Sequence, residues 1–245
     1  MRNIKLVIEY DGTNYHGWQV QPHVVTVQQV IEEKIEIMTR QRTPLIGSGR
    51  TDSGVHALGQ VANFRTTANI PVEGFLKGLN SLLPTDIAIQ SAEEVGLQFH
   101  AQYGARRKTY RYVILRRESP SALFRHYSWR LRGALNLPAM EEATRCLLGK
   151  HDFTSFQGAE PDTEDPVREI FRAEWSEGGL GFLHFTIEAG GFLKHMVRNI
   201  VGTLVEVGKG KISPERFPQI LAARDRRQAG ITAPPQGLFL VEVKY

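Results

Sequence analysis

Two hydrophobic periodicities alternate along this chain, and their alternation limits the folds that it can adopt. In the first ten residues apolar side chains occupy every second position, at Ile4, Leu6, Ile8 and Tyr10. That period is typical of a strand with one buried face. Residues 193–205 instead carry apolar side chains three and four positions apart, up to Gly208, which predicts an amphipathic helix.

The same alternation recurs in both halves of the chain. In the first half, Thr26 and Gln29 have the spacing of a capping box, and Val27, Val30, Ile31, Ile35 and Met38 follow at helical intervals. A second helix is expected over 71–83, with Phe75, Leu76, Leu79 and Leu82 facing inward. Short strands are expected at 60–65, 86–90 and 97–100.

In the second half, strands are expected at 110–115, 127–131, 170–175, 180–188 and 238–243. The third and fourth of these can pair across Gly178-Gly179. Helices are expected from Pro138 to Leu148 and after Pro214, and an acidic surface loop at 160–166. Strands mixed with helices predict two α+β domains, 1–104 and 105–245, because apolar patterning gives way to a basic cluster near residues 102–107.

The bulk properties narrow the possible partners. The formal charge of +4 and a sequence pI of about 9.2 permit a polyanionic partner without requiring one. Cys146 is the only cysteine, which excludes an internal disulfide and a multi-cysteine zinc site and favours a reducing cytoplasm. Apolar runs are too short to cross a membrane. Neither a phosphate-binding glycine loop nor metal-ligand spacing is found, so no cofactor and no metal are expected.

The most unusual stretch is residues 47–56, Gly-Ser-Gly-Arg-Thr-Asp-Ser-Gly-Val-His. Its three glycines exclude a regular helix and allow close approach of the backbone to a ligand. Arg50, Asp52 and His56 lie within it, and an exposed carboxylate can attack a sugar anomeric carbon. The alternative is a structural turn in which Asp52 accepts hydrogen bonds from backbone amides.

Two further segments suit an RNA site. Residues 106–112 interleave four cations, including Arg107 and Arg111, with Tyr110 and Tyr112, a pattern that suits phosphate contact and base stacking. Arg198 lies beside the apolar stripe of the predicted 193–205 helix, where it could favour the ionised form of a carboxylate. Lys194 and His195 precede it. The alternatives are an edge strand with charges facing water and a solvated helix face.

Taken together, these segments closely resemble the TruA family of tRNA pseudouridine synthases. The matching blocks follow the family's order from residue 4 to the C-terminus. They are residues 8–12 (IEYDG), 17–19 (GWQ), 49–56 (GRTDSGVH), 99–101 (FHA), 110–112 (YRY), 147–156 (LLGKHDFTSF), 192–202 (FLKHMVRNIVG) and 233–238 (APPQGL). Residues 102–104 (QYG) depart from the family, which has a more basic stretch there with a phenylalanine.

The resemblance implies a specific function. Asp52 would be the catalytic residue, Arg50 would displace the target base, Tyr110 would stack on it, and Arg198 would pair with Asp52. Arg107, Arg111, His56, Lys194 and His195 are the other expected contacts with the RNA. The substrate would be the tRNA anticodon stem-loop at uridines 38, 39 and 40. The fold would be two ferredoxin-like (RRM-like) halves sharing a continuous mixed or antiparallel sheet with helices on one side. A homodimer would create the RNA clefts.

Two other functions remain open at this stage. A non-catalytic protein that binds structured RNA would keep the basic and aromatic surface but would not require Asp52. A nucleoside hydrolase or glycosidase would also use a carboxylate, but it would normally need a second acid or a metal cluster. Neither is evident in the sequence.

Overall fold

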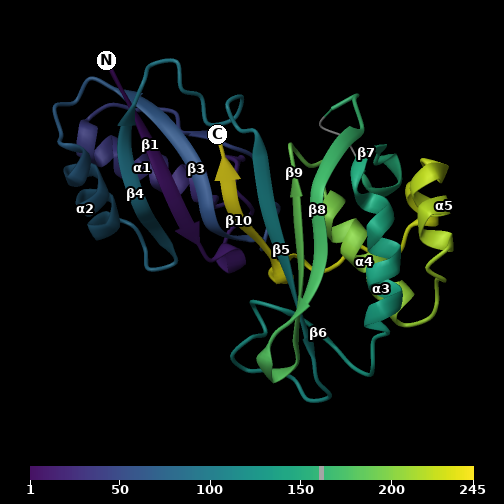
Figure 1. The fold of residues 1–245 in the computed structure, drawn as a ribbon. Helices are drawn as coiled ribbons and strands as arrows, with labels where there is room; N and C mark the ends of the chain where they lie inside the picture. The colour runs from purple at the N-terminus through teal and green to yellow at the C-terminus, as the bar shows by residue number, and fades with distance from the viewer. Residues whose placement is uncertain (160–162) are drawn as a thin grey trace. The chain divides into compact units, whose positions relative to one another are not determined.

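The computed structural model describes residues 1–159 and 163–245, which form two compact units. The first unit contains residues 1–106 and the C-terminal segment Phe239–Tyr245; the second contains residues 107–238 (Figure 1). The second unit therefore begins at Arg107, and the last strand of the chain belongs to the first unit. Within the described part of the chain, no helix is long and apolar enough to cross a membrane.

The first unit is built on a sheet with the strand order β4-β1-β3-β10, and β2 pairs with β3. These strands are β1 (Arg2–Tyr10), β2 (Ile46–Gly47), β3 (His56–Thr66), β4 (Ile87–Val95) and β10 (Leu238–Lys244). β1 is antiparallel to both β3 and β4, whereas β10 is parallel to β3. Leaving β10 aside, the chain order β1-α1-β2-β3-α2-β4 is that of a ferredoxin-like unit.

Two helices, α1 (Val27–Thr39) and α2 (Val72–Leu82), lie together behind this sheet in Figure 1. The predicted N-terminus of α1 is confirmed, because the Thr26 hydroxyl accepts a hydrogen bond from the Gln29 amide. The predicted inward face of β1 is also confirmed, since Ile4, Leu6, Ile8 and Tyr10 are all buried. The inward position predicted for Leu82 is wrong: it is 39% exposed, at the last residue of α2.

The second unit is built on an antiparallel sheet with the order β5-β9-β8-β7, and β6 runs parallel to β5. These strands are β5 (Arg107–Arg116), β6 (Trp129–Leu131), β7 (Gly149–Asp152), β8 (Val167–Glu177) and β9 (Phe182–Ala189). The predicted β8–β9 hairpin is confirmed, with Gly178 donating its amide to Phe182 O.

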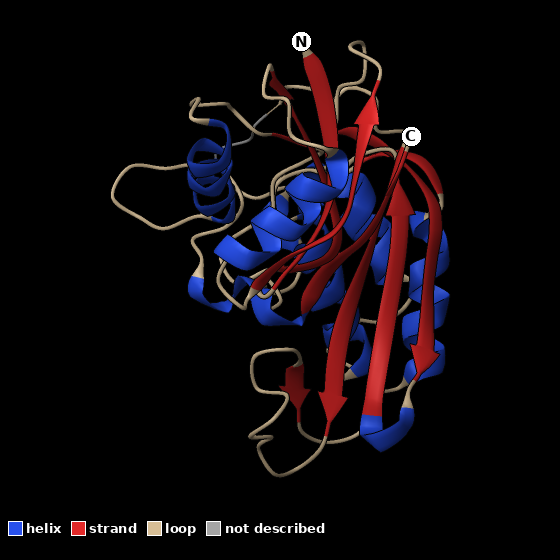
Figure 2. Ribbon diagram, turned by 90° about the vertical axis from the view of Figure 1, so that its left-hand side faces the viewer, coloured by secondary structure: helices blue, strands red, loops and turns tan. Residues whose placement is uncertain are grey.

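The helices of the second unit are α3 (Leu137–Thr144), α4 (Met196–Gly208) and α5 (Arg216–Ala223). α3 and α4 pack on each other and lie side by side in Figure 1. Figure 2 shows the helices of the chain in blue and its strands in red. The Trp175 indole of β8 donates to the buried Thr144 hydroxyl of α3, which ties that helix to the sheet. Six short 3-10 helices complete the described chain: η1 (Gly12–Asn14), η2 (Arg145–Leu147), η3 (Thr154–Phe156), η4 (Gly179–Gly181), η5 (Arg226–Gln228) and η6 (Pro235–Gly237).

Beyond the position of Leu82, further sequence predictions differ from the structure. α4 begins at Met196 rather than Leu193, because His195 has a left-handed backbone (φ 60) that cannot continue a helix. The helix predicted over 138–148 ends at Thr144 and continues only as η2. Residues 97–100 form a turn rather than a strand, with the Phe99 amide donating to Gly96 O. Of the loop predicted at 160–166, residues 160–162 lie outside the described residues, and 163–166 are irregular.

Candidate active site

Asp52 lies in the short loop that joins β2 to β3 in the first unit. The Val55 amide donates to the Asp52 carbonyl at 3.1 Å, which closes a four-residue turn. Gly54 has φ 75 at the third position of that turn, the conformation that a type II turn requires and that glycine adopts without strain. The turn leaves the Asp52 side chain partly exposed, beside an exposed Arg50.

The segment after β1 anchors this loop from one side. The Tyr10 and Thr51 hydroxyls form a buried hydrogen bond of 2.7 Å, and the Trp18 amide donates to Thr51 O. Gly17 has φ +87, and a Cβ there would lie 2.6 Å from Thr51 O. Only glycine, which has no Cβ, allows the two backbone segments to come this close. Burial raises the pKa of the Tyr10 phenol well above its usual range, so Tyr10 is a neutral hydroxyl and not a base.

A second anchor comes from β3. The Ser48 hydroxyl donates to Gln60 Oε1 at 2.6 Å, and Gln60 Nε2 donates to Gly49 O at 3.0 Å. Gln60 is fully buried and its hydrogen bond to Ser48 is shielded from water, so the two contacts fix the loop just before Arg50. The loop is thus held on both sides, and the Asp52 carboxylate is carried on a rigid backbone.

His56 is enclosed at the end of this loop. Its side chain is 2% exposed, and its ring stacks on Phe239 with 4.7 Å between centroids. His56 Nδ1 accepts from the Gly12 amide at 3.0 Å and lies 3.1 Å from Asp11 Oδ1. An enclosed imidazole cannot reach a phosphate, so this geometry suits a residue that shapes the loop better than the RNA contact expected from the sequence.

The second unit carries the aromatic part of the predicted site. Tyr110 and Tyr112 lie on the same face of β5, two residues apart. The Tyr110 ring is 8% exposed and meets Phe192 edge-on, with 5.1 Å between centroids. Tyr112 is fully buried and donates its hydroxyl to Pro234 O at 2.7 Å. Phe192 therefore fixes the plane of the more accessible ring.

Arg198 lies in the first turn of α4, where the backbone of residues 231–233 holds it. Its Nε donates to Ala233 O at 2.8 Å, while the Ala233 amide donates to Arg198 O at 3.1 Å. Burial raises the pKa of the Tyr112 phenol well above its usual value. The positive charge of Arg198 is near enough to oppose that rise. Arg198 and the tyrosine face of β5 are therefore neighbours within this unit.

A hydrogen-bond network centred on the buried Asn199 supports the segment that holds Arg198. Asn199 Oδ1 accepts from Arg226 Nη2 at 3.1 Å and from the Thr232 hydroxyl at 2.7 Å. Arg226 Nη1 also donates to Gly230 O at 2.9 Å. Burial lowers the Arg226 pKa from its ordinary value. The network ties residues 229–233 to α4 at the turn that carries Arg198.

The remaining predicted contacts are spread over the second unit. Arg107 pairs with Glu188 at 2.9 Å and lies over the Phe171 ring at 4.3 Å, yet its side chain is 48% exposed. Arg111 is exposed on the same strand. Lys194 and His195 form the turn before α4, where the Gly158 amide donates to Lys194 O at 2.8 Å.

Comparison with known proteins identifies the family. A family model described as tRNA pseudouridine synthase matches residues 6–104 and 143–245, well over half of the chain. The chain belongs to this tRNA pseudouridine synthase family. Over the full length of both proteins it is 47% identical to tRNA pseudouridine synthase A of Thermoanaerobacter sp. (strain X514). It is likewise 49% identical to that of Acetivibrio thermocellus and 50% identical to that of Geotalea daltonii. The synthase is accordingly an isomerase.

Several residues that shape the site of this synthase were not assigned a role from the sequence. Tyr10, Gly17 and Trp18 occur in the blocks that resemble the family, but sequence alone did not show that they hold the Asp52 loop. Nor did the sequence show that Phe192 packs against Tyr110 or that the Ala233 carbonyl holds Arg198. Asn199 lies next to Arg198 in the sequence, and that adjacency was the one available signal.

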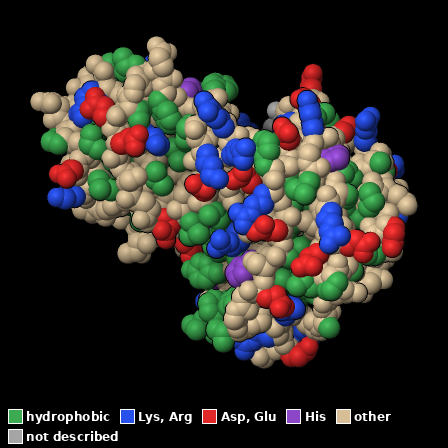
Figure 3. Space-filling view, viewed as in Figure 1, with side chains coloured by type: hydrophobic (Ala, Val, Ile, Leu, Met, Phe, Trp, Pro, Cys, Tyr) green, Lys and Arg blue, Asp and Glu red, His purple; other side chains and the backbone are tan. Residues whose placement is uncertain are grey.

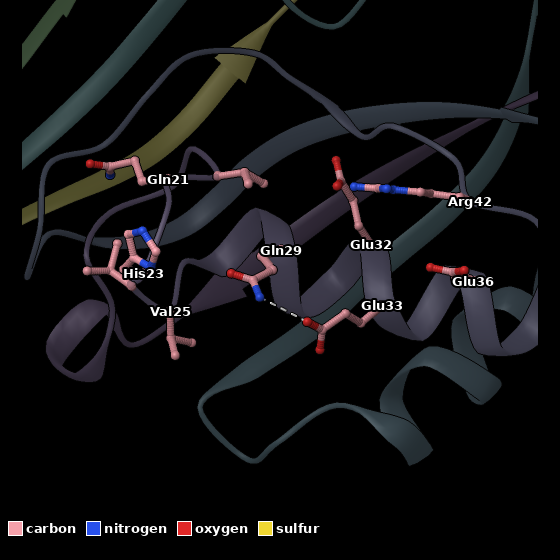
Figure 4. A pocket seen from close by; sticks show the side chains of 10 residues that line it. Gln21, His23, Val25, Gln29, Glu32, Glu33, Glu36 and Arg42 are labelled. Carbon is pink, nitrogen blue, oxygen red and sulfur yellow. Dashed lines mark hydrogen bonds between the residues drawn. The ribbon is translucent and has the colours of Figure 1, made fainter.

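A hollow of about 540 Å³ lies elsewhere on the synthase, beside α1 (Figure 4). Glu32, Glu33 and Glu36 line it together with Arg42 and His23. Three carboxylates against one arginine would repel a polyanion, so this hollow does not suit RNA. Among the described residues, no group of three or more His, Cys, Asp or Glu side chains is arranged to hold a metal ion.

Proposed function

We propose that this chain converts uridine to pseudouridine in the anticodon stem-loop of tRNA, at positions 38, 39 and 40, with Asp52 as the essential carboxylate. Membership of the synthase family over the whole chain supports the reaction. One observation carries the role of Asp52. Contacts to the buried residues Tyr10, Trp18 and Gln60 hold its turn in place, while the carboxylate stays partly exposed. The resemblance described above supports the three positions.

The proposed reaction exchanges one bond of the ribose C1′ atom for another. The N1–C1′ bond breaks, the detached uracil turns, a C5–C1′ bond forms, C5 loses its proton and N1 gains one. The exchange has no net oxidation, reduction or hydrolysis, so it needs no cofactor. Asp52 starts it either by attacking C1′ or by removing a ribose proton, and both routes require the ionised carboxylate.

The other site residues have distinct roles in this proposal. A uridine inside a stem must first leave the base stack, at a cost of a few kcal/mol. Arg50, exposed beside Asp52, fills the space that the base leaves. Tyr110, braced by Phe192, stacks on the detached uracil. Arg198, fixed by Ala233 O, stabilises the ionised Asp52. Arg107, Arg111 and Lys194 contact phosphates.

In this proposal the first unit carries the aspartate loop, and the second unit, residues 107–238, carries the tyrosine and the arginine. We also propose that the chain acts as a homodimer in the cytoplasm. The resemblance to the TruA family supports the dimer, and the lone Cys146 is in keeping with a reducing compartment. Light scattering of the purified protein tests the dimer.

The function is tested by replacing Asp52 with Asn, which keeps the side-chain volume and removes the charge. We expect Asp52→Asn to abolish pseudouridine formation in tRNA while the affinity for tRNA stays within a few-fold of that of the unmodified protein. Asp165→Asn is the matched control, because Asp165 is exposed and its Oδ1 accepts a hydrogen bond from the Val167 amide. Normal product formation by Asp52→Asn would remove Asp52 from the mechanism.

The product separates the proposed function from its two alternatives. Tritium release from tRNA labelled at uridine C5 reports the loss of the C5 proton. A protein that only binds structured RNA would bind tRNA and release no tritium. A nucleoside hydrolase would liberate free uracil, which chromatography of the supernatant detects.

A further inference from the structure

A cluster of aromatic rings lies at the end of the first unit's sheet, apart from the Asp52 loop. Four side chains form it: Phe99, His100, Tyr103 and Tyr245. The Phe99 and Tyr245 rings are 4.8 Å apart, and the His100 and Tyr103 rings are 4.4 Å apart and nearly parallel, at 26°. We call these four residues the aromatic platform.

Tyr103 is the exposed surface of the platform. It is 81% exposed, the largest exposed fraction of any described aromatic residue among the exposed large hydrophobics. Its inner face lies on the His100 ring, and its outer face is open to water. The backbone amides of Gln102 and Tyr103 both donate to His100 Nδ1 at 3.2 Å. These two hydrogen bonds fix the imidazole plane on which the tyrosine ring rests.

Buried amides hold the platform in place. Asn3, fully buried in β1, donates its side-chain amide to Gly96 O and Phe99 O at 3.1 and 3.0 Å. Asn63 in β3 accepts from the Ala101 amide at 2.8 Å. The Tyr245 hydroxyl donates to Ala101 O at 2.8 Å, which fastens the turn to the end of β10. A turn held at this many points is pre-organised for a ligand.

Cations lie beside two of the rings and in the segments next to the platform. Lys5 Nζ lies 5.7 Å from the centroids of both Phe99 and Tyr245, within the range of a cation–π contact. Arg65 is exposed and donates to Leu97 O in the same turn, and Arg106 is exposed three residues after Tyr103. Lys5 Nζ lies 3.4 Å from the Glu93 carboxylate. Figure 3 shows Lys and Arg side chains interspersed with Asp and Glu side chains on the face that it draws.

We propose that Tyr103 stacks on a nucleobase of the bound tRNA and so forms an RNA contact outside the reaction site. An exposed ring backed by a second ring and flanked by cations is the arrangement with which proteins bind bases and phosphates together. This inference rests on the proposed function, because it takes tRNA as the ligand.

The position of the platform indicates that the base on Tyr103 is not the reacting uridine. β10 pairs with the start of β3 at Phe239 and His56, next to the Asp52 loop, and ends beside the platform at Tyr245. Six residues of strand span about 20 Å at ~3.3 Å per residue. A base on Tyr103 is therefore several nucleotides away from the base that reacts at Asp52, so the contact contributes to tRNA affinity and not to chemistry.

The test measures tRNA binding and turnover of Tyr103→Ala, with Tyr103→Phe as the variant that keeps the ring. We expect Tyr103→Ala to raise the Kd for tRNA and the KM about 5- to 150-fold, the range that corresponds to loss of one stacked base, with kcat unchanged. Tyr103→Phe should bind within two-fold of the unmodified protein. Gln102→Ala, at an exposed neighbour without a ring, is the matched control.

Salt dependence separates stacking from charge. Tyr103→Ala should leave the slope of log Kd against log salt unchanged, whereas Arg106→Ala should reduce it by about 0.7–0.9 if that side chain meets a phosphate.

The inference is overturned if Tyr103→Ala binds tRNA as tightly as the unmodified protein, or if Tyr103→Phe loses as much affinity as Tyr103→Ala. A change of oligomeric state in Tyr103→Ala with unchanged tRNA affinity would instead make the ring a protein contact. If the unmodified protein forms no pseudouridine at all, the proposed function fails rather than this contact.

Discussion

Gly202 in α4 allows a sharp test of how Arg198 is held. A Cβ at position 202 would lie 1.7 Å from Ile231 O and 3.2 Å from the Ala233 amide nitrogen. Both atoms belong to the backbone segment whose carbonyl at Ala233 fixes Arg198. That segment is itself tied to α4 through Thr232 and Asn199, so it cannot move away freely. Gly202→Ala should therefore disturb the fold and Arg198 together.

The expected magnitude follows from two opposing effects. Replacing glycine by alanine inside a helix stabilises it by about 1 kcal/mol. Forcing a methyl group against a backbone oxygen that has no rotatable bond to relieve the contact costs about 3 kcal/mol, the upper part of the range for overpacking. The net loss of about 2 kcal/mol corresponds to a fall in Tm of ~4–8 °C for a chain of this size.

Gly78→Ala in α2 provides the matched comparison. A Cβ there would lie 2.4 Å from Met38 Cε, which is the end of a flexible side chain and can move aside. The same substitution should then raise Tm by ~2–4 °C, because only the gain in helix stability remains. Calorimetry of both variants and a single-turnover assay of Gly202→Ala measure the effects. An unchanged or higher Tm for Gly202→Ala would refute the reasoning.

Three further outcomes are expected. Arg198→Ala should lower the single-turnover rate of pseudouridine formation more than it lowers tRNA affinity, and an unchanged rate would count against its role beside Asp52. Asn199→Leu removes the buried hydrogen bond to Phe156 O and the hydrogen bonds from the half-buried Arg226 and Thr232, and it should reduce the free energy of unfolding by roughly 3 kcal/mol, measured in urea. Burial raises the pKa of the Cys146 thiol to about 11, so alkylation of the native protein by iodoacetamide should be slow at pH 8 and accelerate up to that pH. Rapid labelling at pH 8 would contradict it.

The periodic elements could be predicted from the sequence because their patterns reflect burial on one face. The alternation of Ile4, Leu6, Ile8 and Tyr10 gives a strand whose inward face is the one predicted. The stripe of α4 is so regular that only its first turn was misplaced. That error has a local cause: the apolar pattern reaches Leu193, but the left-handed backbone of His195 stops the helix from beginning there. Short strands without alternation, β2 and β7, gave no signal.

The candidate site was predictable only in its chemically distinctive residues. A loop with three glycines, an arginine and a carboxylate is unusual enough to single out Asp52. Nothing in the local sequence shows that the hydroxyl of Tyr10 bonds to Thr51, or that the Ala233 carbonyl orients Arg198, since those partners are 41 and 35 residues apart. Such contacts depend on which strands pair and on how a loop folds back on a helix.

The amino-acid sequence by itself determined the α+β class, the presence and type of the longer elements and the choice of Asp52 as the candidate carboxylate, because periodicity and residue chemistry are local properties. Only the tertiary structure decided that β10 returns to pair with β3, that His56 is enclosed, and that Tyr103 stands exposed on His100. The physical reason is that pairing and burial depend on the whole chain: hydrogen bonds between strands and the exclusion of water from a side chain are fixed by segments far away in sequence.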